Sequence, residues 1–175
     1  MRAMSDRPSI FIEPFSLAKK EMSVERSLPF DGMDRLSELV LAPQGEVAIS
    51  LHFGIDPLRK RVMHGTVSAD VVMRCERCLQ DMQVKIIANV NVGLVKNHKQ
   101  AKELPEEYEP LLLESDEPIS LSELAEDELI LSLPIAPRHE SKDTCIDMDE
   151  YRAEDEPQEE KKNPFAALAA LKEKH

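Results

Sequence analysis

The stretch Met82–Leu94, with the sequence MQVKIIANVNVGL, places an apolar side chain at every even-numbered position. Polar side chains, among them Gln83, Lys85 and Asn89, lie between them. Because successive side chains of a strand point to opposite faces, this alternation predicts a long β-strand with one buried face. A strand of this length needs a curved sheet or a partial barrel to cover its apolar side.

Two earlier segments show the same alternation, with apolar side chains at the odd positions of 47–53 and 67–73. Asp56-Pro57 marks a turn between them, and Gly65 is consistent with a β-bulge before the second segment. Because the connections are too short for crossover helices, we expect the three strands to be antiparallel. The predicted fold is therefore an α+β fold, a curved antiparallel β-sheet or partial barrel with a few short helices.

Helix signals occur on both sides of these strands. Asp31 is placed to cap a short helix that ends near Pro43, and Ser120 with Glu123 forms a capping box before an apolar-periodic segment that Pro134 ends. The predicted apolar faces consist of Met33, Leu36, Leu39 and Val40 in the first helix, and of Leu121, Leu124, Ala125, Leu129 and Leu133 in the second.

The chain divides into three predicted parts. Residues 1–139 form a single α+β domain, and residues 140–162 form an acidic flexible arm because they are polar and unpatterned. Asn163 and Pro164 then begin a C-terminal apolar helix over 163–173. Its stripe of Phe165, Leu168 and Leu171 is predicted to dock on a partner, because the preceding arm is longer than docking on the chain's own sheet requires; packing on that sheet is the alternative.

Charge is distributed unevenly along the 175 residues. The net charge is −12, yet residues 1–103 carry 15 basic and 13 acidic side chains, and residues 104–175 carry 7 and 21. A protein this acidic does not coat phosphate backbones by bulk electrostatics, so any RNA contact falls to the first half. No apolar run approaches the length of a membrane span, which argues against a membrane association.

Cys75 and Cys78 lie in the predicted turn before the long strand. A C-x-x-C pair in a hairpin turn has the form of a zinc knuckle, and His139 with Cys145 would complete a Cys3His site. Two ordinary reduced thiols, or a redox pair, are the alternatives. The redox alternative is poorly supported because a strand, not a helix, follows Cys78. Three cysteines are typical of a reducing cytosol.

No catalytic constellation is evident in the sequence. Acidic pairs such as Glu106 and Glu107 are abundant, but in an acidic chain their abundance carries no information about general acid–base roles. No catalytic residue is therefore predicted. A hydrolase or nuclease with a carboxylate metal site in the acid-rich segment remains the alternative from another functional class.

Four stretches, in order, resemble the YceD-like family of large ribosomal RNA subunit accumulation proteins. They are Cys75–Cys78, Leu104–Pro110, Glu126–Pro134 and Asn163–Leu168. The resemblance covers nearly the whole chain. It implies a cytoplasmic, non-enzymatic ribosome biogenesis factor that supports the synthesis, processing or stability of large-subunit (23S-type) ribosomal RNA. Some members carry a cysteine-rich stretch after the Leu-Pro motif, whereas this chain has only Cys145 there.

Two mechanisms fit what the resemblance implies. In the first, the N-terminal half contacts the large-subunit ribosomal RNA precursor through a small basic cluster. Its candidate members are Arg59, Lys60, Arg61, Lys96, Lys99 and Lys102. In the second, the acidic half holds a basic ribosomal protein through charge complementarity.

Overall fold

A computed structural model describes residues 10–113, 118–140 and 145. The chain forms two compact units, Met1–His139 and Glu140–His175. All helices and strands described below belong to the first unit. The predicted C-terminal helix over 163–173, with Phe165, Leu168 and Leu171, lies outside the described residues, as does nearly all of the predicted arm over 140–162.

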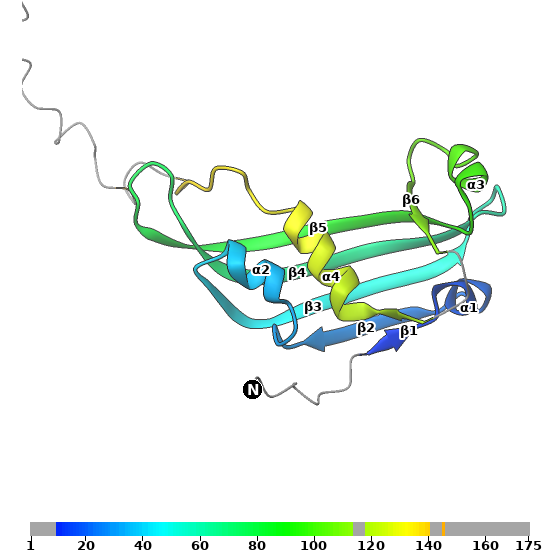
Figure 1. Cartoon of the computed structure of the whole chain (residues 1–175), viewed down its shortest axis with the longest axis horizontal. Helices are drawn as coiled ribbons and strands as arrows, with labels where there is room; N and C mark the ends of the chain where they lie inside the picture. Colours follow the sequence, from blue (N-terminus) through cyan, green and yellow to red (C-terminus); the bar gives the residue numbers. More distant parts are fainter. Residues whose placement is uncertain (1–9, 114–117, 141–144, 146–175) are drawn as a thin grey trace, which may run out of the picture. The chain divides into compact units, whose positions relative to one another are not determined.

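A mixed five-stranded sheet dominates the first unit (Figure 1). The order β2-β3-β4-β5-β6 follows the sequence. Strands β3, β4 and β5 are antiparallel, as predicted, and the unpredicted β2 pairs antiparallel with β3, but β6 runs parallel to β5. The connection over 96–108 contains helix α3 (His98–Lys102) and is long enough to carry the chain back beside Val92, so that β6 runs in the same direction as β5. The strand bounds are Ser23–Leu28 for β2, Ala42–Ile55 for β3, Arg61–Arg74 for β4, Asp81–Val95 for β5 and Glu109–Leu112 for β6.

The alternation predicted for the long strand is confirmed. In β5, Ile86, Ala88 and Val90 are buried, whereas Lys85 and Asn89 are exposed. The odd positions of β3 and β4 supply the facing side chains of the same core, among them Leu51 and Val71. One face of the sheet is therefore apolar and covered, and the other is polar and exposed.

Gly65 does not lie at a bulge, contrary to the prediction. It pairs in continuous register with Leu51 of β3 and Val90 of β5. Its φ is +151°, and a Cβ atom added there would lie 2.0 Å from the carbonyl oxygen of Ser50. The glycine therefore permits a close approach of two backbones. The register shift in β3 falls instead between Gln44 and Ala48.

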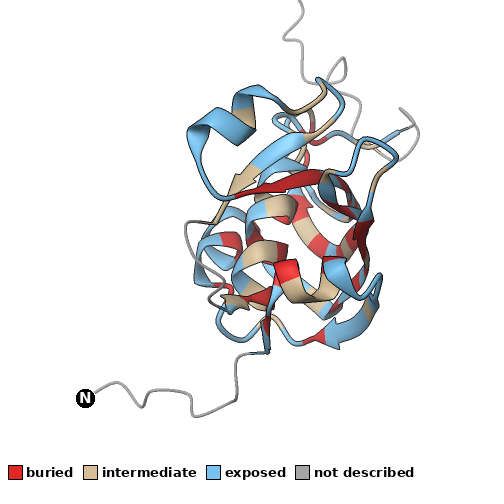
Figure 2. Cartoon of the chain, turned by 90° about the vertical axis from the view of Figure 1, so that its right-hand side faces the viewer, coloured by how far each residue is buried: buried red, intermediate tan, exposed pale blue. Residues whose placement is uncertain are grey.

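Besides α3, three helices and a small two-stranded sheet accompany the main sheet. Figure 1 shows α4 crossing the sheet with α2 beside it, and Figure 2 shows buried residues between the helices and the strands. Helix α1 packs on β3 and β4, and α4 packs on β4 and β5. The bounds are Pro14–Lys19 for α1, Asp34–Leu39 for α2, Leu121–Leu131 for α4, Phe11–Ile12 for β1 and Ile119–Ser120 for β7, which pairs with β1.

The two predicted helix caps have different outcomes. Ser120 caps α4, because its Oγ accepts a hydrogen bond from the Glu123 backbone N–H at 3.3 Å. Asp31 is not the N-cap of α2, since Met33 occupies that position and makes no side-chain cap. The acceptor for the start of α2 comes from a different part of the chain, the side chain of Glu126 in α4.

Candidate metal centre and nucleic-acid interface

Cys75 and Cys78 lie in the tight turn that joins β4 to β5, as the sequence predicts. The backbone N–H of Cys75 donates to the Gln80 carbonyl at 2.9 Å, and the N–H of Leu79 donates to the Cys75 carbonyl at 2.9 Å. Leu79 adopts a φ of 58°, which closes the turn. Both thiols are buried and are therefore held in place by the hairpin.

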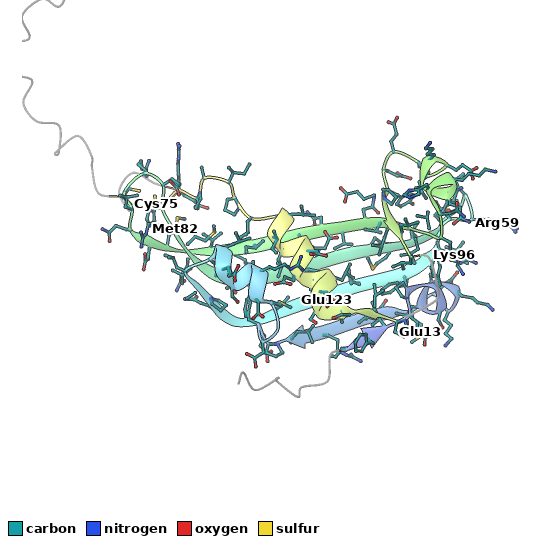
Figure 3. All side chains as sticks on the ribbon, viewed as in Figure 1. Glu13, Arg59, Cys75, Met82, Lys96 and Glu123 are labelled. Atoms are coloured by element: carbon teal, nitrogen blue, oxygen red, sulfur yellow. The ribbon has the colours of Figure 1, made fainter. Side chains whose placement is uncertain are left out.

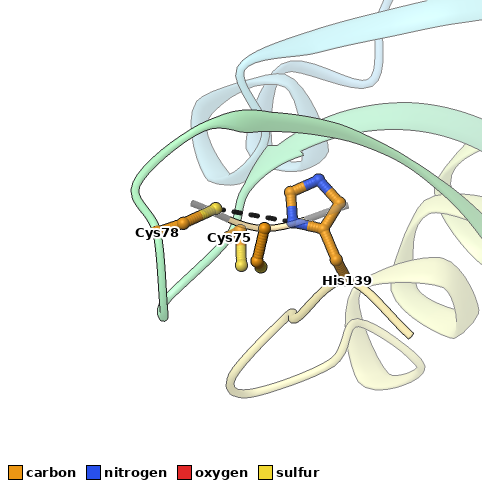
Figure 4. Close-up of side chains that lie close together, drawn as sticks. Cys75, Cys78 and His139 are labelled. Atoms are coloured by element: carbon orange, nitrogen blue, oxygen red, sulfur yellow. Dashed lines mark hydrogen bonds between the residues drawn. The ribbon is translucent and has the colours of Figure 1, made fainter. Parts of the chain in front are cut away.

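His139 reaches this turn from the segment that follows α4. The backbone N–H of Glu76 donates to the Pro137 carbonyl at 2.8 Å and fixes that segment beside the turn. The Sγ atom of Cys78 then lies 3.5 Å from Nδ1 of His139 (Figure 4). Residues more than sixty positions apart in the sequence thus form one cluster.

The donor set of this cluster suits a metal ion. The ligand atoms of Cys75, Cys78 and His139 all lie within 4.8 Å of one another. Around a tetrahedral zinc ion, bond lengths of about 2.3 Å to sulfur and 2.1 Å to nitrogen place neighbouring ligand atoms roughly 3.6 Å apart. The observed separation of 3.5 Å between Cys78 Sγ and His139 Nδ1 matches that spacing. The cluster could therefore hold a metal such as zinc.

The surroundings of Cys75 favour the thiolate form of its side chain. Burial raises its pKa, but hydrogen bonds from the backbones of Cys78, His139 and Arg77 and from the Cys78 thiol outweigh this effect and lower the pKa to about 5. A thiolate is the form that binds metal. Cys145 belongs to the second unit, so its role as the fourth ligand stays a prediction.

The predicted RNA-contacting residues lie at the opposite end of the sheet from the knuckle, as the labelled Arg59, Lys96 and Cys75 show in Figure 3. Arg59 and Lys60 occupy the β3–β4 turn, where the Asp56 side chain accepts the Lys60 backbone N–H at 2.7 Å. Arg61 begins β4, and Lys96 follows the last residue of β5. The antiparallel pairing brings these two strand ends together.

Helix α3 adds Lys99 and Lys102 to the same end of the sheet. Asn97 caps this helix through a 3.0 Å hydrogen bond from the Gln100 backbone N–H, and the Gln100 side chain accepts the Lys96 N–H at 2.8 Å. All six predicted residues therefore lie at one end, and all except the half-buried Lys60 are exposed. We call this set of Arg59, Lys60, Arg61, Lys96, Lys99 and Lys102 the basic end.

Sequence reasoning missed the contribution of helix α1 to the basic end. The ring of Phe15 lies 4.9 Å from the Lys96 Nζ atom and 5.7 Å from the Arg61 Cζ atom. Lys19 lines a hollow beside the same two cations. The available signal was the spacing of Phe15 and Lys19, which lie four residues apart and so share one face of a helix.

The acidic residues do not form a comparable cluster in the part of the chain that the structure describes. Within residues 10–113, 118–140 and 145, the only metal-competent groups of three or more His, Cys, Asp or Glu side chains involve the cysteines. No described helix combines the length and apolar character needed to cross a membrane.

Comparisons with known proteins agree with the resemblance found in the sequence. The family model described as "Large ribosomal RNA subunit accumulation protein YceD" matches residues 63–172. A relative of that name from Haemophilus influenzae is 33% identical over 165 residues, which cover 93% of this chain and 95% of the relative. No solved structure gives a significant match. The family description names an effect on ribosomal RNA accumulation and no catalysed reaction.

Proposed function

Because the chain belongs to the family of large ribosomal RNA subunit accumulation proteins, we propose that it acts by contacting the precursor of large-subunit ribosomal RNA through the basic end. In this proposal the protein is a non-enzymatic ribosome biogenesis factor of the cytoplasm. It protects or positions RNA during synthesis or processing and performs no chemistry on it.

One observation carries the proposal, namely that the basic end gathers cations from three separate segments of a net acidic chain. The turn at Arg59, the strand end at Lys96 and helix α3 meet there. Phosphate contacts supply most of the affinity of a protein for RNA when no aromatic platform is available. Acidic residues lie next to the basic end along the chain, with Asp56 in the β3–β4 turn and Glu103 at the C-cap of α3, and these carboxylates limit the extent of the basic end.

A complementation experiment tests this function. In a strain that lacks the gene, we expect wild-type protein to restore large-subunit ribosomal RNA and a triple variant of the basic end, Arg59→Gln, Lys99→Gln and Lys102→Gln, to fail. The matched control removes three exposed cations outside the basic end, at Lys20, Arg26 and Lys85. Equal restoration by both triple variants would contradict the proposal, provided that both have wild-type melting temperatures.

A second candidate function, the holding of a basic ribosomal protein, is favoured by an apolar hollow of about 400 Å³ near the knuckle. Leu39, Leu41 and Ile135 line it and are 54%, 49% and 102% exposed. Two carboxylates, Glu38 and Glu76, and one cation, Arg74, also line it, so the hollow has a small excess of negative charge and would suit a segment with apolar and basic side chains.

The two candidates predict different variants to fail. If a basic protein is the client, Ile135→Asp reduces RNA accumulation in cells while binding of purified protein to RNA is unchanged. Ile87→Asp, on the exposed face of β5, is the control, because Ile87 is 54% exposed and lies outside the hollow. Loss of accumulation with both variants would indicate a general effect of added charge.

We also propose that the cluster of Cys75, Cys78 and His139 holds zinc, with Cys145 as the fourth ligand. The donor types and the 3.5 Å spacing support this proposal. Zinc would be structural here, because a closed set of four protein ligands leaves no position for substrate. It would fix the β4–β5 turn to the segment that follows α4.

A further inference from the structure

A hollow of about 310 Å³ lies at the basic end, between helix α1 and the ends of two strands. It is lined by Glu13, Phe15, Ser16, Lys19, Arg61 and Lys96. Figure 3 shows the labelled Glu13 and Lys96 at the same end of the unit. Three of the six lining residues are cations: Lys19 in α1, Arg61 at the start of β4 and Lys96 directly after β5.

The alternation of side chains along β4 and β5 explains why two cations meet in this hollow. Arg61 shares its side of β4 with Met63, which is 0% exposed, and Lys96 continues the side of β5 that buries Leu94. Each inward-facing apolar row therefore ends in a cation where the core ends. The core aromatic ring of Phe15 lies beneath both charges, at 5.7 Å and 4.9 Å.

The ring positions the cations but does not neutralise them. Cation–π attraction holds the Arg61 guanidinium and the Lys96 ammonium near the Phe15 ring, although the two positive charges repel each other. Lys19, one helical turn after Phe15, adds a third positive charge. Glu13 is the one carboxylate among the lining residues, so cations outnumber carboxylates there.

We propose that this hollow binds a backbone phosphate of RNA, with Lys19, Arg61 and Lys96 as the cationic donors and Ser16 as a hydroxyl donor. The inference rests on the proposed RNA contact and names its anchor point. A phosphodiester carries the negative charge that the lining lacks, and its oxygens accept the hydrogen bonds that guanidinium, ammonium and hydroxyl groups donate. Because Phe15 is only 9% exposed, the ring supports the cations and is not a stacking surface for a base.

Salt-dependent binding of a transcribed fragment of large-subunit ribosomal RNA tests the assignment. Each phosphate contact contributes about 0.7 to the slope of log affinity against log salt for single-stranded RNA. We expect Lys19→Gln and Arg61→Gln each to lower the slope by about this amount. The matched control is Lys20→Gln, because Lys20 is the next exposed cation and does not line the hollow.

A variant with the opposite expected effect guards against misinterpreting a folding defect. Glu13→Gln removes the carboxylate that competes with phosphate, so it should tighten RNA binding even though loss of a carboxylate beside cations at the start of α1 slightly lowers the melting temperature. Tighter binding by this variant, together with weaker binding by Lys19→Gln, supports the anchor. Equal slopes for Lys19→Gln, Lys20→Gln and the wild type would overturn it.

Failure of the anchor and failure of the proposed function give different results. If the wild type binds RNA with a slope that Lys99→Gln lowers and Lys19→Gln does not, the RNA contact stands and the hollow is not its anchor. If the wild type binds no RNA, both proposals fail.

Titration with inorganic phosphate tests whether the hollow binds free phosphate instead of RNA. Saturable phosphate binding that Lys19→Gln abolishes, combined with unchanged RNA binding, would assign the hollow to free phosphate and overturn the RNA anchor.

Discussion

The Glu126 side chain of helix α4 caps helix α2, because its Oε1 atom accepts the backbone N–H of Leu36 at 3.0 Å. Its Oε2 atom accepts hydrogen bonds from Nη2 and Nε of Arg35 at 2.7 Å and 3.1 Å. Glu126 is only 3% exposed, so this carboxylate lies within the contact between the two helices. The cap that the sequence assigned to Asp31 is thus supplied by a residue that lies 90 positions after Leu36.

Replacement of Glu126 by alanine should lower the free energy of unfolding by about 1–3 kcal/mol, because the Leu36 N–H loses its buried acceptor. Glu126→Gln should cost less, since an amide oxygen still accepts that hydrogen bond. Asp127→Asn is the control: its ion pair with Arg35 is more than half exposed and contributes roughly 0–1 kcal/mol. Urea unfolding followed by circular dichroism measures all three. Equal losses for the alanine variant and the control would contradict the capping role.

Gly65→Ala should be strongly destabilising, by about 2 kcal/mol or more, because the new Cβ would lie 2.0 Å from the Ser50 carbonyl oxygen. The backbone of β3 would have to move away, and the pairing with β4 would weaken. Gly54→Ala is the matched control, since its nearest atom belongs to the His52 side chain at 3.4 Å. A melting temperature that falls equally in both variants would show that backbone approach is not the cause.

The sequence predicted the parts of the fold that depend on local periodicity. The strands β3, β4 and β5 were found because one face of each is buried along most of its length. Strands β2 and β6 were missed, since six and four residues are too few to establish an alternation, and helix α1 was missed because no Ser, Thr, Asp or Asn directly precedes it as a cap. The parallel direction of β6 depends on the turn made by α3, which no alternation of side chains encodes.

The candidate-site residues show the same contrast between local sequence motifs, which can be predicted, and tertiary packing, which cannot. Cys75 and Cys78 were found because the motif is local, and the separation of 3.5 Å between Cys78 and His139 agrees with the predicted partner. Asp31 was the wrong choice of cap, since the acceptor for α2 comes from tertiary packing. Lys19 was missed for the same reason, because only the packing of α1 on β3 and β4 brings it to Arg61.

The buried and exposed sides of β5 should respond differently to truncation. Ile86→Ala should lower the free energy of unfolding by about 2–5 kcal/mol, because Ile86 is 2% exposed and its loss leaves a cavity. The neighbouring Ile87→Ala should cost much less, since Ile87 is 54% exposed on the opposite face. Chemical denaturation of the two variants measures the difference. A larger loss at Ile87 would mean that the polar face is covered in solution.

Glu128 should destabilise the protein at neutral pH. Burial, with the charges of Glu109 and Asp127, raises the pKa of this carboxyl above its ordinary 4.5. A raised folded-state pKa means that stability is lost as pH rises from the unfolded-state pKa through the folded-state value. We therefore expect Glu128→Gln to raise the melting temperature at pH 7 and to have little effect below pH 4 or so.

Glu123→Gln is the control for Glu128 because it changes the same chemical group in the first turn of the same helix. There a negative charge is favourable to the helix dipole, so its removal should not stabilise the protein. Thermal unfolding at several pH values compares the two variants. A stabilisation of Glu128→Gln that persists at low pH would show that charge is not its origin.

Removal of zinc should lower the melting temperature, because a ligand that binds only the folded chain stabilises it by mass action. We expect about one zinc per chain in protein purified without chelator, and its loss in Cys75→Ser and His139→Asn. His98→Asn is the control, since His98 lies in α3 at the basic end and is exposed.

Cys145→Ser should weaken zinc affinity if Cys145 is the fourth ligand and leave it unchanged if it is not. Elemental analysis together with thermal unfolding measures these outcomes. Protein without zinc whose stability is unaffected by Cys75→Ser would identify the cluster as ordinary reduced thiols, the alternative that the sequence left open.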